Sequence, residues 1–259
     1  MKVVILAGGL GTRISEESHL KPKPMIEIGE NPILWHIMKI YSKYGFNEFV
    51  ICLGYKGYKI KEYFRDYYMN SSDITFDFEN NQMITHDNKG EKWKVTLVDT
   101  GLKTLTAGRL KRIREYLGDE PFLLTYGDGV GDVNINELIN WHKDKNRIGT
   151  ITSYNWGQRF GVIAVNDEGI VTDFREKKKT DGTVINAGFM VFEPSIFNYL
   201  PEDSDNVMLE EILDRLSKDG ELVAYKHEGF WHGMDTQRDK IMLEEMWQTG
   251  NAKWKIWEN

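Results

Sequence analysis

The residues best suited to chemistry in this sequence are the glycines and basic residues that follow its first apolar segment. Residues 8–13 read Gly-Gly-Leu-Gly-Thr-Arg, and Lys23 lies a few residues later between two prolines. Glycine lets the main chain approach a ligand closely, so such a loop can point N–H groups at phosphate oxygens. Arg13 can grip phosphate with two hydrogen bonds, and Lys23 supplies a point charge. The segment predicts a phosphate site, although the glycines alone would suit a tight strand-to-helix turn with solvated charges.

Two familiar glycine-rich motifs do not fit these residues. A dinucleotide-binding fingerprint needs G-x-G-x-x-G, but the sixth residue counted from Gly9 is Ile14. A P-loop needs a lysine directly after its last glycine, and Thr12 follows Gly11 instead. The later arginine and the Lys-Pro-Lys-Pro at 21–24 indicate a third kind of phosphate loop.

Two aspartates follow apolar segments at places suited to a metal ion. Asp128 comes after Gly127 at the end of the segment 121–126, and Asp235 follows the segment 221–226 and a short aromatic stretch. In doubly wound sheets ligands bind beyond the carboxyl ends of the strands, and Mg²⁺ is usually shared between one or two carboxylates and substrate phosphates. Asp128 is equally well explained as a turn residue, and Asp235 as the N-cap of the next helix.

A third group of polar residues lies between 174 and 188 and suits a sugar phosphate. Phe-Arg-Glu-Lys-Lys-Lys at 174–179 is followed by a strand pattern that contains Asn-Ala-Gly at 186–188. A carboxylate and an amide can contact sugar hydroxyls, and a lysine can contact the phosphate. The triple lysine could also be no more than a solvated loop.

Apolar segments alternate with helical patterns in an order that predicts a mostly parallel sheet. Strands are predicted at 3–7, 48–53, 121–126, 148–153, 184–190 and 221–226. Helices are predicted at 33–44, 58–68, 104–114, 134–145, 194–200, 207–216 and 236–248. The first turn of the helix at 104–114 carries hydroxyls and a glycine, which suits either anion binding or an ordinary cap before a basic helix face.

Two further regions read as antiparallel strands. Residues 74–98 alternate, with a polar turn expected at 87–90, and a hairpin is expected from 161–165 and 170–174. The aromatic tail at 254–257 is expected to dock on the body or on another subunit. His232 is expected to pack or to form hydrogen bonds and not to act as a catalyst.

Composition bounds the class of protein. The 259 residues carry a net charge of −7, which argues against a nucleic-acid partner. Cys52 is the only cysteine, so an intramolecular disulfide is excluded, and its apolar surroundings suggest a core residue. A chain with no signal peptide and no apolar run near ~18 residues predicts a cytoplasmic protein without a membrane partner.

The first 25 residues resemble the signature of the sugar nucleotidyltransferase family, L-A-G-G-x-G-T-R-L followed by K-P. The resemblance covers essentially the whole chain, and several motifs are similar to the cytidylyl branch: Gly-Tyr-Lys-Gly-Tyr at 54–58, Val-Asp-Thr-Gly at 98–101, Gly-Arg-Leu-Lys-Arg at 108–112, Tyr-Gly-Asp-Gly-Val at 126–130 and Met-Asp-Thr-Gln-Arg-Asp at 234–239. It implies an α/β, Rossmann-like nucleotidyltransferase fold: a mostly parallel mixed sheet with helices on both faces and a small β subdomain. A single domain, 1–259, would hold a nucleotide-binding part at about 1–130 and a sugar-phosphate-binding and C-terminal part at about 131–259.

The activity that the resemblance implies is transfer of a cytidylyl group from CTP to α-D-glucose 1-phosphate with Mg²⁺, giving CDP-glucose and pyrophosphate. The alternatives are UTP or dTTP as donor, another phosphorylated acceptor, or a silent regulatory subunit that binds sugar nucleotides. Relatives are homo-oligomers, so an oligomer is expected, a hexamer in the first place, with the mid-chain strands or the aromatic tail at the interface.

The family's functional residues can be carried over position by position. Arg13 and Lys23 would be catalytic, and Asp128 and Asp235 would hold the Mg²⁺ ion. The nucleotide would be bound by Leu6, Ala7, Gly8, Gly9, Leu10, Gly11, Thr12, Arg13, Lys23, Thr104, Arg109 and Gly127. The sugar phosphate would be bound by Glu176, Lys177, Asn186 and Gly188.

Two departures from the family pattern leave the sugar more open than the nucleotide. The family's E-K-P reads Glu-Lys-Lys at 176–178, and its W-Q-P reads Trp-His-Gly at 231–233. Among the nucleotide contacts, Arg109 can only donate hydrogen bonds, which suits the carbonyl oxygen and ring nitrogen of cytosine, whereas uracil would set an N–H against it. Main-chain carbonyls at the end of the first strand could accept from the amino group of cytosine.

Overall fold

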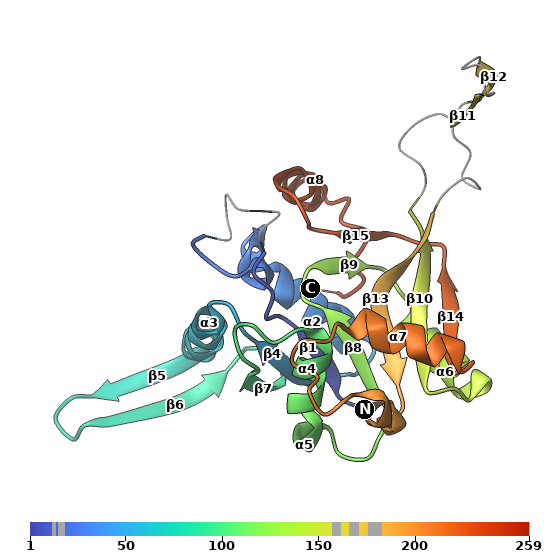
Figure 1. Ribbon diagram of the computed structural model, residues 1–259. Coiled ribbons are helices and arrows are strands. Elements are labelled where there is room, and N and C mark those ends of the chain that lie inside the picture. The colour runs from blue at the N-terminus through green and yellow to red at the C-terminus, as the bar shows by residue number, and fades with distance from the viewer. Residues whose placement is uncertain (12–13, 15–18, 157–161, 166–170, 176–182, 259) are drawn as a thin grey trace.

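The computed structural model describes residues 1–11, 14, 19–156, 162–165, 171–175 and 183–258. At its centre lies a seven-stranded sheet in the order β14-β10-β13-β8-β1-β4-β7 (Figure 1). These strands are β1 (Val3–Leu6), β4 (Glu48–Leu53), β7 (Lys94–Asp99), β8 (Phe122–Tyr126), β10 (Gly149–Asn155), β13 (Val184–Phe192) and β14 (Leu222–His227). Strand β13 is antiparallel to both neighbours and every other pair is parallel, which confirms the mostly parallel mixed sheet.

Helices cover both faces of this sheet. One core joins α2 (Ile33–Lys43), α3 (Gly57–Asn70) and α6 (Ile135–Lys145) to the strands, and the other contains residues of α4 (Thr106–Arg112), α5 (Arg114–Leu117) and α7 (Leu209–Lys218). Along β1, Val3 and Ile5 belong to the first core, while Val4 and Leu6 belong to the second. A strand buried on both faces needs a continuous apolar run, which is the pattern at the start of the chain.

Most predicted elements are confirmed, with some changes at their ends. The helix predicted at 104–114 is interrupted at Ile113, a fully buried residue with φ −102° and ψ 4° that ends α4 and precedes α5. The helix predicted at 194–200 is the 3₁₀ helix η4 (Pro194–Tyr199). Asn134 caps α6 through a hydrogen bond from the Glu137 N–H. Cys52 is fully buried, as expected of a core residue.

The turn predicted at 87–90 was placed wrongly. Strands β5 (Ser72–Asp77) and β6 (Gln82–Asn88) form a hairpin whose turn lies at 78–81, where the Asp77 carboxylate accepts from the N–H groups of residues 79 and 80. Residues 89–93 instead lead from β6 to β7. The hairpin projects from the body (Figure 1), so most of its side chains are exposed on both faces and the alternation of apolar residues carries little information about register.

Short strands and the chain end complete the fold. Strand β9 (Gly129–Gly131) pairs with β15 (Trp231–Gly233), β2 (Glu27–Ile28) with β3 (Asn31–Pro32), and β11 (Val162–Val165) with β12 (Val171–Arg175), all antiparallel. After α8 (Gln237–Gln248), Trp254 is fully buried against His36 of α2 and Trp247 of α8. The aromatic tail therefore docks on the body of its own chain.

Candidate active site

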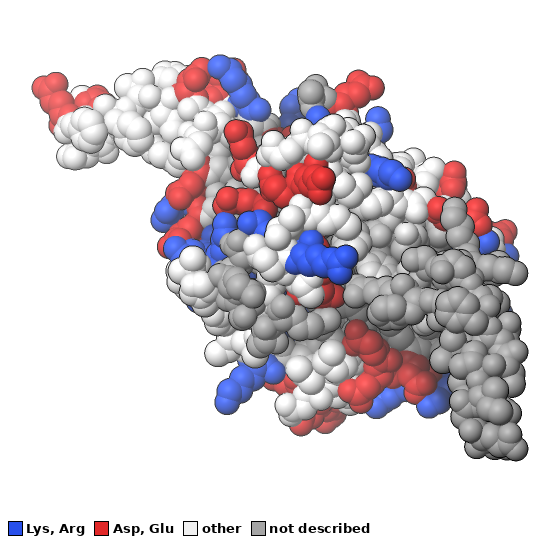
Figure 2. Space-filling model, turned by 90° about the horizontal axis from the view of Figure 1, so that it is seen from above, with Lys and Arg blue, Asp and Glu red and all other residues white. Residues whose placement is uncertain are grey.

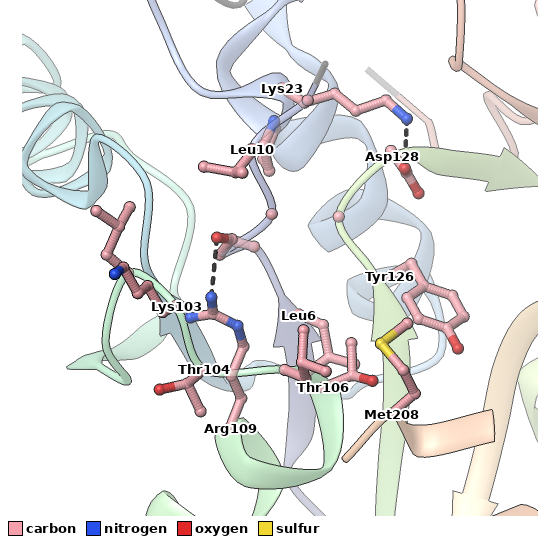
Figure 3. Close-up of a pocket in the computed structure, with 18 of the residues that line it drawn as sticks. Leu6, Leu10, Lys23, Lys103, Thr104, Thr106, Arg109, Tyr126, Asp128 and Met208 are labelled. Carbon is pink, nitrogen blue, oxygen red and sulfur yellow. Dashed lines mark hydrogen bonds and ion pairs between the residues drawn. The ribbon is translucent and has the colours of Figure 1, made fainter. Parts of the chain in front are cut away.

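A cavity of about 670 Å³ opens beyond the carboxyl ends of β1 and β8 (Figure 3). This is the position at which doubly wound sheets bind their ligands. It is lined by the predicted residues Leu6, Ala7, Gly8, Gly9, Leu10, Gly11, Lys23, Thr104, Arg109, Gly127, Asp128 and Asp235. The structure thus brings together all the predicted nucleotide and metal residues that it describes.

Arg109 lies directly beneath the glycine loop. Its Nη2 donates to the Gly8 carbonyl at 3.0 Å, and its Nη1 donates to the Leu53 carbonyl at 2.9 Å and to Thr100 Oγ1 at 2.7 Å. A Cβ on Gly8 would lie 2.1 Å from Nη1, so any other residue at this position would force the guanidinium to move. Arg109 is 4% exposed, so it does not belong to a solvated helix face, and burial lowers its pKa.

Close packing also sets the position of Lys23. It opens the 3₁₀ helix η2 (Lys23–Met25), whose three residues are all buried. Pro24 lies against Gly127, where an added Cβ would be 2.9 Å from the proline Cγ, and the Gly127 N–H donates to the Leu6 carbonyl at 3.0 Å. The lysine is thereby held beside the end of β8.

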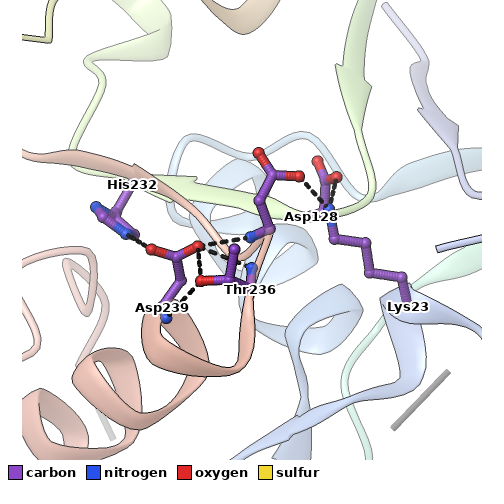
Figure 4. A network of polar contacts seen from close by, with 6 residues as sticks. Lys23, Asp128, His232, Thr236 and Asp239 are labelled. Carbon is purple, nitrogen blue, oxygen red and sulfur yellow. Dashed lines mark hydrogen bonds and ion pairs between the residues drawn. The ribbon is translucent and has the colours of Figure 1, made fainter. Parts of the chain in front are cut away.

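The two aspartates meet at this lysine, which lies 2.6 Å from Asp128 Oδ2 and 2.7 Å from Asp235 Oδ1, measured from Nζ (Figure 4). The short ribbon of β9 and β15 brings them together: Gly129 pairs with Gly233, and the Met234 N–H donates to the Asp128 carbonyl at 2.8 Å. Asp128 is therefore more than a turn residue. Asp235 is not the N-cap of α8, because Thr236 takes that position.

Asp239, in the first turn of α8, holds the backbone of Asp235 in place. Its Oδ2 accepts from the Asp235 N–H at 3.1 Å and from the Thr236 N–H and hydroxyl, both at 2.8 Å, while its Oδ1 lies 2.9 Å from His232 Nε2 (Figure 4). Burial acts to raise the pKa of Asp239, but the hydrogen bonds from His232 and Thr236 outweigh it and lower the pKa. His232 has the hydrogen-bonding role expected of it.

The donor set at this place suits magnesium. Among the described residues there is no group of three or more His, Cys, Asp and Glu side chains that could hold a metal. Two carboxylates alone are typical of Mg²⁺ that is shared with substrate phosphates. The Lys23 ammonium, bonded to both aspartates, demonstrates that these oxygens converge on one cation.

Some predicted residues lie apart from the cavity or outside the described chain. Thr12, Arg13, Glu176 and Lys177 fall outside the described residues. Of the sugar-phosphate residues, Asn186 accepts from the Gly188 N–H at 2.9 Å, and Gly188 (φ +79°) packs against Tyr126, where an added Cβ would be 2.7 Å from Cδ2. Neither Asn186 nor Gly188 is among the residues that line this cavity.

Sequence reasoning missed the apolar wall of the cavity. Beside Leu10, which is 55% exposed, this wall contains Leu102, Leu105, Tyr126 and Met208. The two leucines flank Thr104 and could have been found from that neighbourhood. Met208 lies far along the chain, at the start of α7, and no local pattern pointed to it.

The chain matches the nucleotidyl transferase family over residues 2–249. It belongs to this family. It is 52% identical over its full 259 residues to the glucose-1-phosphate cytidylyltransferases of Salmonella typhimurium and Salmonella typhi, and covers 100% of each.

Among solved structures, UDP-glucose pyrophosphorylase complexed with UDP-glucose superposes with a TM-score of 0.69 at 18% identity, over 96% of this chain and 98% of that one. This likeness confirms the Rossmann-like nucleotidyltransferase fold. No helix among the described residues is long and apolar enough to cross a membrane.

Proposed function

We propose that this nucleotidyl transferase transfers a cytidylyl group from CTP to α-D-glucose 1-phosphate, with CDP-glucose and pyrophosphate as products. The observation that carries the proposal is the 52% identity, over the full length, to two proteins named glucose-1-phosphate cytidylyltransferase. It is supported by the cavity, which combines a glycine loop, a buried lysine and two carboxylates at the strand ends.

The reaction needs positioning and charge neutralisation more than proton transfer. An oxygen of the sugar phosphate attacks the α-phosphorus of CTP in line with the leaving pyrophosphate, and it is already an anion, so no general base is required. Lys23 would neutralise the α-phosphate and Arg13 the leaving pyrophosphate. A magnesium ion, when bound by Asp128 and Asp235, would supply further charge neutralisation at the triphosphate.

The acceptor would be held mainly by residues of the C-terminal part. Lys177 would bind the incoming phosphate, and Glu176 and Asn186 would contact sugar hydroxyls, with Gly188 leaving room beside Tyr126. On this proposal 1–130 binds the nucleotide and 131–259 the sugar phosphate within one domain. Met208 and Asp235 reach the nucleotide cavity from the second part.

Arg109 and Thr104 would face the base. A guanidinium has five N–H donors, and three of those of Arg109 are used by Leu53, Thr100 and Gly8. The other two are suited to the carbonyl oxygen and ring nitrogen of cytosine, and Leu10 and Met208 offer apolar surface for its faces. The Leu6 carbonyl already accepts from Gly127, so Ala7 is the better candidate acceptor for the amino group.

Pyrophosphate release tests the function directly. It should be measured with Mg²⁺ across a panel of nucleoside triphosphates and sugar 1-phosphates. We expect CTP with glucose 1-phosphate to be best, and CTP to be preferred over UTP by roughly tenfold or more, the size of one unpaired buried polar group. Higher kcat/KM with UTP or dTTP would refute the base assignment. Binding of CDP-glucose without turnover on any pair would indicate a regulatory subunit.

The β5–β6 hairpin is the surface that we propose for homo-oligomer formation, in the first place a hexamer. It projects from the body (Figure 1), and its middle stretch is largely uncharged between the charged residues at its tip and those near the body (Figure 2). Its exposed apolar side chains are Phe76, Phe78, Met83 and Ile84, with Phe78 87% exposed. Sedimentation velocity should show a smaller species for the variant Phe76→Ser with Phe78→Ser, and an unchanged sedimentation coefficient would exclude the hairpin.

A further inference from the structure

The side chains of the Lys23, Asp128 and Asp235 cluster are not equally accessible. The lysine side chain is 10% exposed, whereas the two aspartate side chains are 34% and 41% exposed. The lysine comes from η2, and its ammonium ends between the two carboxylates (Figure 4). The carboxylates therefore offer oxygens to the cavity while they are already bonded to a cation of the chain itself.

Two cations compete for the same carboxylate oxygens. An ammonium at 2.6 and 2.7 Å forms two charge-assisted hydrogen bonds, and a divalent ion placed against these oxygens would repel it at close range. The loss of these bonds is offset when another anion, such as a nucleotide phosphate, accepts hydrogen bonds from Lys23 instead. A phosphate in the cavity would thus favour the metal by drawing the lysine away.

From this geometry we infer that Lys23 occupies the cation position of the nucleotide-free chain, and that the lysine and a divalent metal bind the aspartate pair in exclusive alternation. The free chain consequently binds the metal weakly, and a nucleotide recruits metal by offering the lysine a new partner. This inference deepens the proposed function and relies on it only for the identity of the nucleotide. A fixed structural ion pair that tolerates the metal beside it is the competing explanation.

Metal binding by the chain alone separates the two explanations. Mn²⁺ binding should be measured by the loss of its free paramagnetic resonance signal, without nucleotide, for wild type, Lys23→Gln and Lys21→Gln. Lys21 is a matched control, because it is a near neighbour whose ammonium pairs with Glu27 at 2.9 Å. We expect Lys23→Gln to bind Mn²⁺ roughly tenfold or more tightly than wild type, since two hydrogen bonds to charged groups need not be broken first. Mn²⁺ binding by the Lys21→Gln control should stay within about twofold of wild type, because the charge that it removes is paired with Glu27 and not with the two aspartates.

The gain must also depend on the carboxylates. Adding Asp128→Asn to Lys23→Gln should abolish the tighter Mn²⁺ binding. Equal or weaker Mn²⁺ binding by Lys23→Gln, or a gain that survives Asp128→Asn, would overturn the inference.

A measurement on wild type covers the case in which Lys23→Gln fails to fold. Acetylation by an amine-reactive reagent, read by mass spectrometry, should rise at Lys23 relative to Lys21 when Mn²⁺ is added, and an unchanged ratio counts against the exchange.

Adding CTP to wild type should tighten Mn²⁺ binding. If Mn²⁺ releases Lys23 but CTP has no effect while another nucleotide does, the exclusion stands and the proposed substrate is wrong. If no nucleotide has an effect, the coupling to nucleotide is wrong.

Discussion

The packing of Arg109 under the glycine loop can be tested by adding a single methyl group. In Gly8→Ala the new Cβ would lie 2.1 Å from Arg109 Nη1 and 2.2 Å from Cζ. Neither distance is tolerable, so the guanidinium must move. Because Nη1 and Nη2 hold the carbonyls of Leu53 and Gly8 and the hydroxyl of Thr100, movement disturbs several hydrogen bonds at once.

The size of the effect follows from these contacts. Overpacking a filled site costs about 1–3 kcal/mol, and each lost hydrogen bond to a charged group costs about 1.5–3 kcal/mol. Overpacking together with the loss of one bond gives a destabilisation of about 3 kcal/mol or more. For a chain of this size about 3 kcal/mol corresponds to a fall in Tm of roughly 6–12 °C.

Calorimetry with a neighbouring glycine as control measures this directly. Gly9 has nothing within 4 Å of the position that a Cβ would take, so Gly9→Ala should change Tm by no more than about 2 °C, as surface substitutions do. A double-mutant cycle then identifies the partner. In an Arg109→Ala background Gly8→Ala should cost less than about 0.5 kcal/mol, because the atoms that it strikes are absent.

Two results would refute this reasoning. If Gly8→Ala were as harmless as Gly9→Ala, the guanidinium would not be wedged beneath the loop. If Gly8→Ala destabilised the wild type and the Arg109→Ala variant equally, the cost would come from the backbone of the loop and not from Arg109.

Three further predictions concern the histidine, the second aspartate and the tail. Burial lowers the pKa of His36 to about 4, whereas the same histidine in the unfolded chain has a pKa near 6.5 and takes up a proton first. The free energy of unfolding should therefore fall by up to about 3 kcal/mol between pH 6.5 and pH 4. Urea titrations should show a smaller fall in the free energy of unfolding for His36→Gln. Asp239→Ala should lower kcat about 10–100-fold by releasing Asp235, whereas loss of the cap of α6 in Asn134→Ala should lower stability alone. Trp254→Ala should cost about 3–5 kcal/mol in calorimetry, because the ring is fully buried.

The buried parts of the fold were predictable because burial leaves a simple pattern. Every residue of β1 is covered on one face or the other, so its apolar run is continuous and its type is clear. The N-cap at Asn134 was readable because a cap is a local contact, here with the Glu137 N–H. The turn of the β5–β6 hairpin was misplaced because most of the hairpin's side chains are exposed, and alternation along exposed strands does not fix where the turn lies.

Many of the residues that line the site could be predicted from the sequence, but the contacts that hold them in place could not. The glycine loop could be recognised because a close main-chain approach demands glycine. At Gly8 the residue that leaves room for no side chain is Arg109, which comes from a distant segment of the chain, so no local spacing in the sequence reveals the contact. Met208 was missed for the same reason. It reaches the cavity from a distant part of the chain, where the Leu209 N–H donates to Thr106 Oγ1 at 2.6 Å and helps to anchor the start of α7 beside α4.

Lys23, Asp128 and Asp235 could each be assigned a role from the sequence, but the structure gives the three residues a role together. Each was assigned by type, the lysine to a phosphate and the carboxylates to a metal, and the two assignments were independent. The antiparallel register of β9 and β15 and the short helix η2 place all three within hydrogen-bonding distance. In the exclusive alternation inferred above, a phosphate that draws the lysine away from the carboxylates leaves them to the metal, so metal and nucleotide binding become linked in free energy, and by reciprocity each strengthens the other. The coupling is thus a consequence of packing, and it would vanish in a chain with the same residues and a ribbon shifted by one position.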